Sequence, residues 1–376
     1  MRRALALALA ALLLLGACGD APAPVPTPEP AAEAAVTGHM ETRYAEQFSV
    51  DYRDDGGALV TIAGEDRFLV VPENWAGDAE GVPVLVKPLD RLYVAATSAM
   101  DLFLSLDALD RVRFTSTTAS NWGLPEVREA IEAEELIYTG KYSAPDFELL
   151  LSEGCSAAIE STMIYHSPDI KEKLEALGIP VLVERSSYEP HPLGRVEWVK
   201  LYGLLLDREA EAEAFFDAQA ARLDALSALP AGDKSVAFFH ISTAGAAVVR
   251  KPGDYVTKLI ELAGGRYVFS ELPGSEDSSL STMNMQMESF YAGAKDADVL
   301  VYNSTIDGEL DSLDQLLEKS SLLADFKAVQ SGNVWCTEHN MFQKSSAAAG
   351  IIADFNTILS LGPEAPNALE FLHRLS

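Results

Sequence analysis

The chain has 376 residues, a length that suits two domains. Apolar residues make up 48% of it, so it can bury a core, while 57 acidic residues against 28 basic ones give a formal net charge of −29. A surface this negative repels phosphate backbones, which argues against nucleic acid as a partner.

The first residues have the pattern of an export signal. Arg2 and Arg3 precede the apolar run ALALALAALLLL, which is shorter than the ~20 residues that a membrane span needs. The run ends in LGAC, which resembles a bacterial lipobox, whose cysteine takes a diacylglyceryl group. We therefore expect a signal peptide over residues 1–17 and lipid attachment at Cys18, on the outer face of the bacterial cytoplasmic membrane. An ordinary secretory signal with a chance cysteine is the alternative.

The stretch GDAPAPVPTPEPAAEAA follows Cys18 and has little to bury. Its Pro, Ala and Glu content predicts an extended tether over residues 18–40. The remaining cysteines, Cys155 and Cys336, lie far apart, and we interpret them as free, buried, small apolar residues. Because no CxxC or HExxH spacing occurs, we expect neither a metal site nor a cofactor.

The first half of the body reads as an α/β lobe over residues 41–193. FSVDYRDDGGALVTIAGEDRFLVV alternates apolar and polar residues around DDGG, which predicts an antiparallel hairpin. Beyond it, the segments RLYVAAT, DRVRFTS, ELIYTG, CSAAIES and IPVLVE predict short strands, with helical segments such as SAMDLFLSLDAL between them. This alternation is typical of parallel βα units.

A second lobe of the same style is predicted over residues 230–376. Its strands are expected in KSVAFFHIS, DADVLVYNS and GNVWCTE. Its helices are expected in DYVTKLIELAGG, where the glycines suit a helix end, and in AAAGIIADFNTILS.

A long helical stretch joins the two halves. GRVEWVKLYGLLLDREAEAEAFFDAQAARLDAL contains one glycine after its start, Gly203, and no proline. It predicts a single helix from about Arg195 to Leu226, roughly 50 Å long at ~1.5 Å per residue, within a bridge over residues 194–229. Such a helix would fix two lobes on either side of a cleft and permit only a small rotation. A long helix within one larger domain is the alternative.

Two carboxylates occupy matching places in the halves. Glu148 opens a helix that leads to a strand at Ile159, and Glu288 opens one that leads to a strand at Val299. The helix dipole alone favours each carboxylate by ~0.3–1 kcal/mol. Their matched placement also favours the hypothesis of one shared external partner.

These features together resemble the ABC-transporter substrate-binding proteins for iron complexes, heme and cobalamin. The resemblance is carried by PDFELLL, MQMESFYAGAKDADVLVY and SSYEPHPLGRVEWVKLYGLLLDREAEAEAFF, and extends from about Phe48 to Leu359. It implies an α/β fold in which one long α-helix bridges two Rossmann-like lobes with mainly parallel sheets, the ligand lying in the cleft between them. It also implies that Glu148 and Glu288 dock on arginines of an ABC permease dimer, which works with its ATPase. We expect a monomer. The family's usual PD before the first-lobe strand is absent, since CSAAI stands there.

Ligand sites in open α/β sheets lie beyond the carboxyl ends of the strands. The residues that we expect there are Ser98, Trp122, Tyr142, Met163, Tyr165, Arg185, Tyr188, His240, Arg250 and Asn303. Arg185 and Arg250 suit an anionic ferric siderophore, because an arginine forms charge-assisted hydrogen bonds with anionic oxygens. The aromatic residues suit a planar or corrin-like surface.

Heme and cobalamin are the alternative ligands. His166 or His339 would be the candidate to coordinate a heme iron, although a lone histidine is more often a hydrogen-bonding partner. A strand-end arginine is more often a surface or lobe-lobe contact than a ligand group, and a loop aromatic fills the packing about as often as it lines a ligand.

A secreted lipoprotein enzyme is the rival class. A hydrolase of the α/β type would need a GxSxG elbow, and none occurs. Ser242 lies near His240 in FHISTAGAA, but no matched acid can be identified. The sequence therefore predicts a binding protein without catalytic residues.

Overall fold

The computed structural model describes residues 34–376 except 80, 228–231 and 273–281. The predicted signal peptide, Cys18 and most of the tether lie outside the described residues. Among those described, no helix is long and apolar enough to cross a membrane. The predicted tether extends too far at its C-terminal end, because β1 (Val36–His39) already pairs with β2 (Phe48–Arg53).

An N-terminal sheet opens the described chain, in the order β1-β2-β3-β4-β5. Its further strands are β3 (Ala58–Ile62), β4 (Asp66–Pro72) and β5 (Val84–Lys87). All pairs are antiparallel except β4 with β5. The hairpin predicted around DDGG is confirmed as β2–β3. Alternation places Phe48 and Val50 in the core, and the Phe48 ring packs 5.2 Å from the Trp198 ring, which belongs to a central helix.

The first lobe is built on a parallel sheet in the order β10-β9-β6-β7-β8. Its strands are β6 (Leu92–Val94), β7 (Val112–Thr115), β8 (Ile137–Tyr138), β9 (Ala158–Ser161) and β10 (Val181–Glu184). Its helices are α1 (Thr97–Ser105), α2 (Pro125–Glu132), α3 (Phe147–Ser152) and α4 (Pro168–Ala176). The predicted βα alternation is confirmed, and it brings the carboxyl ends of the strands to one edge of the sheet.

The second lobe contains a mixed sheet in the order β14-β12-β11-β15-β16-β17, with β13 also paired to β11. Its strands are β11 (Ser235–Ile241), β12 (Ala247–Arg250), β13 (Arg266–Tyr267), β14 (Thr282–Met285), β15 (Val299–Tyr302), β16 (Val334–Thr337) and β17 (Leu372–Arg374). Its helices are α7 (Tyr255–Leu262), α8 (Met287–Ala294), α9 (Leu313–Lys319), α10 (Lys327–Ser331) and α11 (Ala348–Leu361). Cys155 in the first lobe and Cys336 in the second are both free, and only Cys336 is fully buried.

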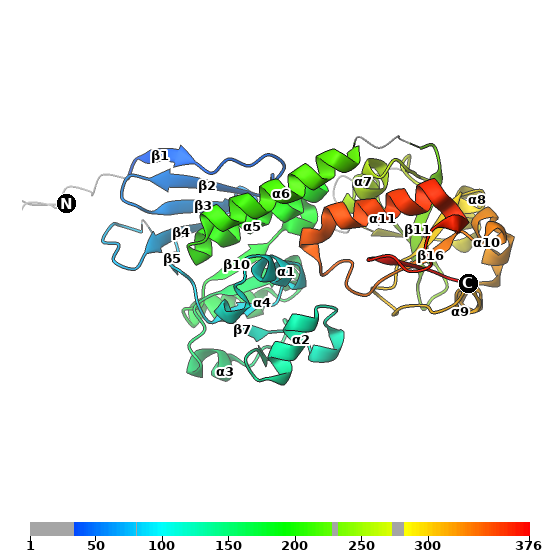
Figure 1. Cartoon of the computed structure of the whole chain (residues 1–376). Helices are drawn as coiled ribbons and strands as arrows, with labels where there is room; N and C mark the ends of the chain where they lie inside the picture. Colours follow the sequence, from blue (N-terminus) through cyan, green and yellow to red (C-terminus); the bar gives the residue numbers. More distant parts are fainter. Residues whose placement is uncertain (1–33, 80, 228–231, 273–281) are drawn as a thin grey trace, which may run out of the picture. The chain divides into compact units, whose positions relative to one another are not determined.

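The single helix predicted from about Arg195 to Leu226 is wrong. The stretch forms α5 (Pro192–Leu206) and α6 (Glu209–Ser227), which lie side by side as a helical hairpin (Figure 1). Asp207 ends α5 in the left-handed conformation, with a φ of 60°. Gly203 permits the close approach, because a Cβ there would lie 2.5 Å from the Ala212 Cβ. The bridge to the second lobe is therefore α6 alone, which packs on α5 and α11.

All residues of α5 are buried. The N-terminal sheet covers it on one side, α1 lies on another, with the Phe103 and Tyr202 rings 5.0 Å apart, and α6 covers a third. A helix enclosed in this way needs no polar face, which explains why its sequence lacks the usual 3.6-residue alternation.

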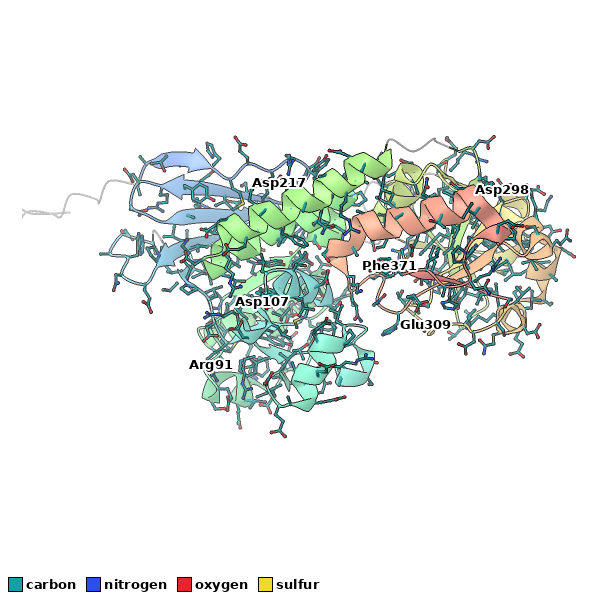
Figure 2. The ribbon with its side chains drawn as sticks, in the orientation of Figure 1. Arg91, Asp107, Asp217, Asp298, Glu309 and Phe371 are labelled. Carbon is teal, nitrogen blue, oxygen red and sulfur yellow. The ribbon has the colours of Figure 1, made fainter. Side chains whose placement is uncertain are left out.

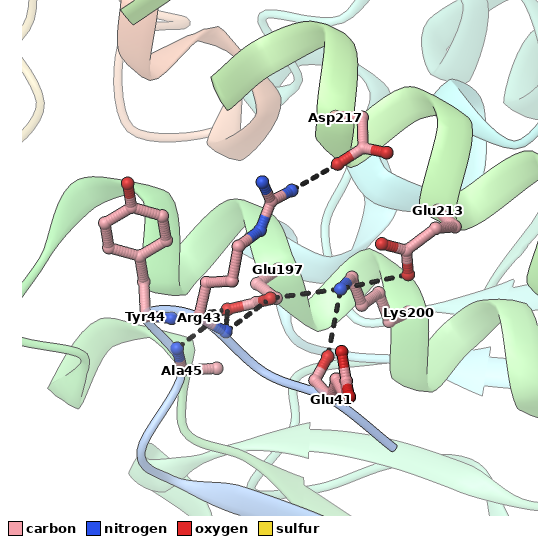
Figure 3. Close-up of polar contacts among 8 residues, drawn as sticks. All are labelled: Glu41, Arg43, Tyr44, Ala45, Glu197, Lys200, Glu213 and Asp217. Carbon is pink, nitrogen blue, oxygen red and sulfur yellow. Dashed lines mark hydrogen bonds and ion pairs between the residues drawn. The ribbon is translucent and has the colours of Figure 1, made fainter. Parts of the chain in front are cut away.

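Glu197 on α5 is fully buried and fully hydrogen-bonded (Figure 3). Its carboxylate accepts backbone N–H groups of residues 43–45 at 2.8–3.0 Å, and Lys200 Nζ lies 3.2 Å from its Oε1. Removing one partner of such a buried pair typically costs about 3–5 kcal/mol, so this network firmly ties the segment before β2 to α5.

A second carboxylate continues the same attachment. Glu189 accepts the N–H groups of Glu46 and Gln47 at 2.7 and 3.0 Å. The Arg43 guanidinium forms an ion pair with Asp217 on α6 (Figure 2 and Figure 3). The segment at residues 43–47 is thus bound to both helices of the hairpin, close to where α5 begins.

Candidate functional site

A cavity of about 560 Å³ lies between the two lobes. The first lobe lines it with the ends of all five of its strands, β6 to β10, and the loops that follow them, as expected for the carboxyl ends of parallel strands. The second lobe contributes Arg250, Asp254, Tyr255 and Phe342, and α5 contributes Arg195 from its first turn.

The first-lobe wall consists largely of small hydroxyl side chains. They are Thr97, Ser98, Ser116, Thr117, Ser161, Thr162 and Ser187. Each hydroxyl can donate or accept, so this wall can hydrogen-bond an oxygen-rich surface in many orientations. Ser98 Oγ donates to Glu184 Oε2 at 2.9 Å, and Glu184 also accepts the Ser186 N–H, so this buried carboxylate of the wall is already satisfied.

The second-lobe wall is made of larger groups. The rings of Tyr255 and Phe342 meet edge to face at 6.1 Å, and the Arg250 guanidinium lies 4.8 Å from the centre of the Phe342 ring. Asp254 caps α7 through the Val256 N–H and lies 3.6 Å from Arg250. Burial raises the pKa of Asp254, and the nearby Arg250 charge opposes that rise.

Two guanidinium groups line the cavity from different elements. Arg195 and Arg250 are 7% and 9% exposed, on a chain that carries a net charge of −29. Arg195 lies 4.1 Å from the centre of the Tyr255 ring, and its buried Nε has no hydrogen-bond partner among the described residues. A desolvated cation of this kind gains much from an anionic oxygen brought within reach.

Four of the ten ligand residues proposed from the sequence line the cavity. They are Ser98, Tyr142, Met163 and Arg250. The other six lie outside the cavity lining.

Arg185 and Tyr188 both lie outside the lining, with Arg185 turned toward the N-terminal sheet. Its Nε donates to Gln47 Oε1 at 3.1 Å, and its guanidinium stacks on Tyr188 at 4.7 Å. Trp122 is 1% exposed, and its Nε1 donates to the Thr117 carbonyl at 3.2 Å. Trp122 therefore lies behind the hydroxyl wall, in the core.

The last three predicted residues also lie outside the lining. Tyr165 is 47% exposed. Asn303 is buried and accepts hydrogen bonds from the N–H and hydroxyl of Thr305, which shapes the turn after β15. His240 lies within β11, where burial lowers its pKa and so favours the neutral imidazole near neutral pH.

Sequence reasoning missed Lys141, Arg195, Asp254, Tyr255 and Phe342. The strand-end rule selects loops, whereas Arg195 lies one turn into a helix and Phe342 follows β16 by several residues. Nothing in the local pattern distinguishes Arg195 from an ordinary helical arginine, because its burial depends on the hairpin packing.

Neither His166 nor His339 is among the residues that line the cavity. Within the described ranges, no cluster of three or more His, Cys, Asp or Glu side chains is arranged to hold a metal ion.

Glu148 and Glu288 occupy equivalent positions. Each is the second residue of its helix, α3 and α8 respectively, and each is exposed. No ion pair is formed by either carboxylate with another described residue. This agrees with the sequence-based placement in the two halves, while docking on a permease stays a prediction.

Comparison with known proteins supports the fold. The family model described as "Periplasmic binding protein" matches residues 94–340, more than half of the chain. An uncharacterized lipoprotein of Methanocaldococcus jannaschii is 25% identical over 353 residues, which cover 86% of this chain and 82% of the relative.

Three solved structures share the fold at low identity. A periplasmic heme-binding protein of Vibrio cholerae has 20% identity and a TM-score of 0.58, covering 72% of this chain and 98% of its own. A periplasmic vitamin B12 binding protein of the same organism has 15% identity and a TM-score of 0.52, covering 73% and 97%. An ABC-type Fe³⁺-hydroxamate transport protein of Saccharomonospora viridis has 18% identity and a TM-score of 0.54, covering 71% and 93%.

The two-lobe α/β fold, the cavity between the lobes and the family match over residues 94–340 agree with one another. The chain belongs to the periplasmic binding protein family, the extracytoplasmic substrate-binding proteins of ABC importers, and it is a transport protein rather than an enzyme.

Proposed function

We propose that this protein captures an anionic metal chelate of the ferric siderophore type and delivers it to the permease of an ABC importer. The observation that carries the proposal is the pair of buried guanidinium groups, Arg195 and Arg250, in a cavity of about 560 Å³ between the lobes. The volume falls within the range of ordinary small-molecule sites, ~300–1,000 Å³.

Charge favours an anionic ligand over a neutral one. The acidic surface repels anions at a distance, so an anion needs local cations to bind. Arg195, Arg250 and Lys141 supply them and outnumber the two lining carboxylates, Glu184 and Asp254, of which Asp254 is paired with Arg250. The hydroxyl wall supplies further donors for carboxylate, catecholate or hydroxamate oxygens. The sequence predicts Arg185 and Arg250 as the anion-binding pair, but Arg195 and not Arg185 lines the cavity with Arg250.

Heme and cobalamin are the competing ligands, and solved relatives with those names share the fold. The aromatic groups Tyr142, Tyr255 and Phe342 would suit a flat macrocycle. Among the described lining residues there is no histidine, but Tyr142 and Met163 are of types that coordinate heme iron, so axial ligation does not separate heme from the chelate. The hydroxyl wall is polar for a porphyrin face, and together with the lining cations it favours the chelate.

Delivery and location complete the proposal. The exposed carboxylates of Glu148 and Glu288 would meet arginines of a permease dimer and fix the docking register. A lipid on Cys18 would hold the protein, as a monomer, at the outer face of the cytoplasmic membrane, and no resident cofactor is required.

The proposal is tested by ligand identification. The mature protein is purified under mild conditions, its bound small molecules are identified by mass spectrometry, and the stripped protein is titrated with a ferric tris-catecholate, a ferric trihydroxamate, heme and cobalamin. We expect the ferric chelates to bind more tightly than the two macrocycles. Tight cobalamin binding that is unaffected by Arg195→Gln would instead assign the protein to corrinoids.

The anchor is tested separately with Cys18→Ala. We expect this variant to be released from membranes or left unprocessed. If the variant is cleaved and membrane-bound like the parent, the prediction of a lipid anchor at Cys18 is wrong.

A further inference from the structure

The two lobes are joined directly by residues 339–346, which connect β16 to α11 and which we call the clasp segment. Gln343 Oε1 accepts the Gly123 N–H at 2.7 Å, and Gln343 Nε2 donates to the Asn121 carbonyl at 2.9 Å. Gly123 and Asn121 belong to the first-lobe loop before α2. One second-lobe side chain thus makes two hydrogen bonds to first-lobe backbone.

Further contacts flank this pair. His339 Nε2 lies 3.2 Å from the same Asn121 carbonyl. At the other end of the clasp segment, the Ser346 N–H donates to Asp101 Oδ2 at 2.7 Å, and Asp101 is a buried residue of α1. The clasp segment is therefore attached to the first lobe at two places.

The packing between these attachments is close. A Cβ at Gly123 would lie 2.7 Å from the Asn340 Cβ and 2.9 Å from its Cα. A side chain there would displace the clasp segment, so the fit depends on glycine at this position although its backbone needs no left-handed conformation.

The clasp segment also carries part of the cavity wall. Phe342, the residue before Gln343, lines the cavity, and both Arg250 and Tyr255 pack against its ring. A ligand that touches Phe342 or Arg250 therefore touches the same short stretch of backbone that holds the lobes together.

We propose that the clasp segment sets how far the cavity opens and that a bound ligand tightens it through Phe342. Outside the clasp segment, the lobes meet where α5 and α6 pack on α7 and α11, whereas the bonds of Gln343 and Ser346 join the second lobe to the loop before α2 and to α1. Each hydrogen bond shifts an opening equilibrium by roughly 2- to 13-fold, so losing the pair at Gln343 is a measurable change. The predicted response to ligand rests on the proposed function. The predicted limit on the opening of the cavity, which we call the mechanical role of the clasp segment, does not.

The mechanical role is tested without ligand, by hydrogen exchange of the mature protein. The reporter is the Ser346 amide, because its acceptor, Asp101, is not touched by the substitutions. We expect Gln343→Ala and Gly123→Ala, which disturb the contact from opposite lobes, each to speed exchange at Ser346 by roughly tenfold. The matched control is Gln330→Ala, which replaces an exposed glutamine on α10. This variant should leave the exchange rate at Ser346 unchanged. An unchanged exchange rate at Ser346 in both test variants would overturn the proposal that the clasp segment limits the opening of the cavity.

The response to ligand is tested by adding a ferric tris-catecholate. We expect slower exchange at Ser346 in the parent and faster dissociation of the chelate from Gln343→Ala than from Gln330→Ala. If the chelate binds without slowing the exchange, the coupling is wrong. If it does not bind at all, the proposed function fails, and the ligand-free comparison still decides the mechanical role.

Discussion

The two walls of the cavity are built from different chemistry. Four first-lobe loops, each following a parallel strand, bring small hydroxyl groups to the cavity. The second lobe brings rings, a guanidinium and a carboxylate from antiparallel β12, the start of α7 and the clasp segment. Many weak and adaptable donors, with Lys141 among them, therefore face a few strong and directional groups. We expect the binding free energy to be concentrated on Arg250 of the second lobe and Arg195 of α5.

The largest effect should come from the arginines. A hydrogen bond to a charged group contributes ~1.5–3 kcal/mol, so replacing both Arg195 and Arg250 with glutamine should weaken binding of a ferric tris-catecholate by about 100-fold or more. Thr162→Val on the hydroxyl wall should cost less than roughly tenfold. Fluorescence titration measures all the affinities. Equal losses of affinity for the double arginine variant and for Thr162→Val would contradict the asymmetry.

Two controls belong with this experiment. Arg185→Gln should leave the affinity unchanged, because Arg185 bonds Gln47 and stacks on Tyr188 outside the cavity. Arg250→Gln also removes the ion pair with buried Asp254, so its unfolding free energy must be measured in parallel. Arg195→Gln, which breaks no ion pair of the described residues, gives the cleaner affinity.

Docking should depend on the two lobes equally, in contrast to ligand binding. Glu148→Ala and Glu288→Ala should each preserve ligand affinity and melting temperature while lowering uptake several-fold, and the double variant should be worse than either. Uptake of labelled chelate in cells is the readout. Normal uptake by the double variant would show that both residues act only as carboxylates at helix starts. A loss of ligand binding would show that they belong to the cleft.

Buried carboxylates offer a comparison that depends on pH. In the first lobe, Glu160 is fully buried, neither of its oxygens has a hydrogen-bond partner among the described residues, and burial raises its pKa to about 8. In the second lobe, Asp354 accepts the Phe371 N–H at 2.7 Å, and burial raises its pKa to about 6. The carboxyl group without a hydrogen-bond partner thus has the larger rise in pKa.

Glu160 should make the folded state less stable as the pH rises. The ordinary pKa of Glu160 is 4.5, so between about pH 4.5 and 8 the folded state holds a proton that the unfolded state has lost. Its contribution to stability therefore falls as pH rises through this range, by at most about 1.4 kcal/mol per pH unit. Glu160→Gln should unfold at higher denaturant than the parent at pH 9, with little difference at pH 4. Parallel curves for the two proteins would contradict the raised pKa.

The sequence predicted the lobes better than the cavity. Strands in both lobes follow from short apolar runs between turn signals, and the matched helix starts at Glu148 and Glu288 follow from the dipole. The hairpin of α5 and α6 was missed, because DRE carries no glycine or proline and Asp207 adopts its left-handed conformation only to let the helices pack. The cation pair was missed for the same reason: α5 brings Arg195 to the cavity only once the hairpin has formed.

The smallest effect should be the change of shape on binding. The sequence predicts one stiff helix between the lobes. The structure has α6 packed on α5 and α11 instead, and the clasp segment joins the facing edges of the lobes. Both features resist a wide hinge, so a ferric tris-catecholate should change the radius of gyration by little more than the error of small-angle scattering. Gln343→Ala should enlarge that change, since the ligand-free protein would open further before closing. A large decrease in the parent would show that neither α6 nor the clasp segment restrains the lobes, and the two walls would then meet only around a ligand.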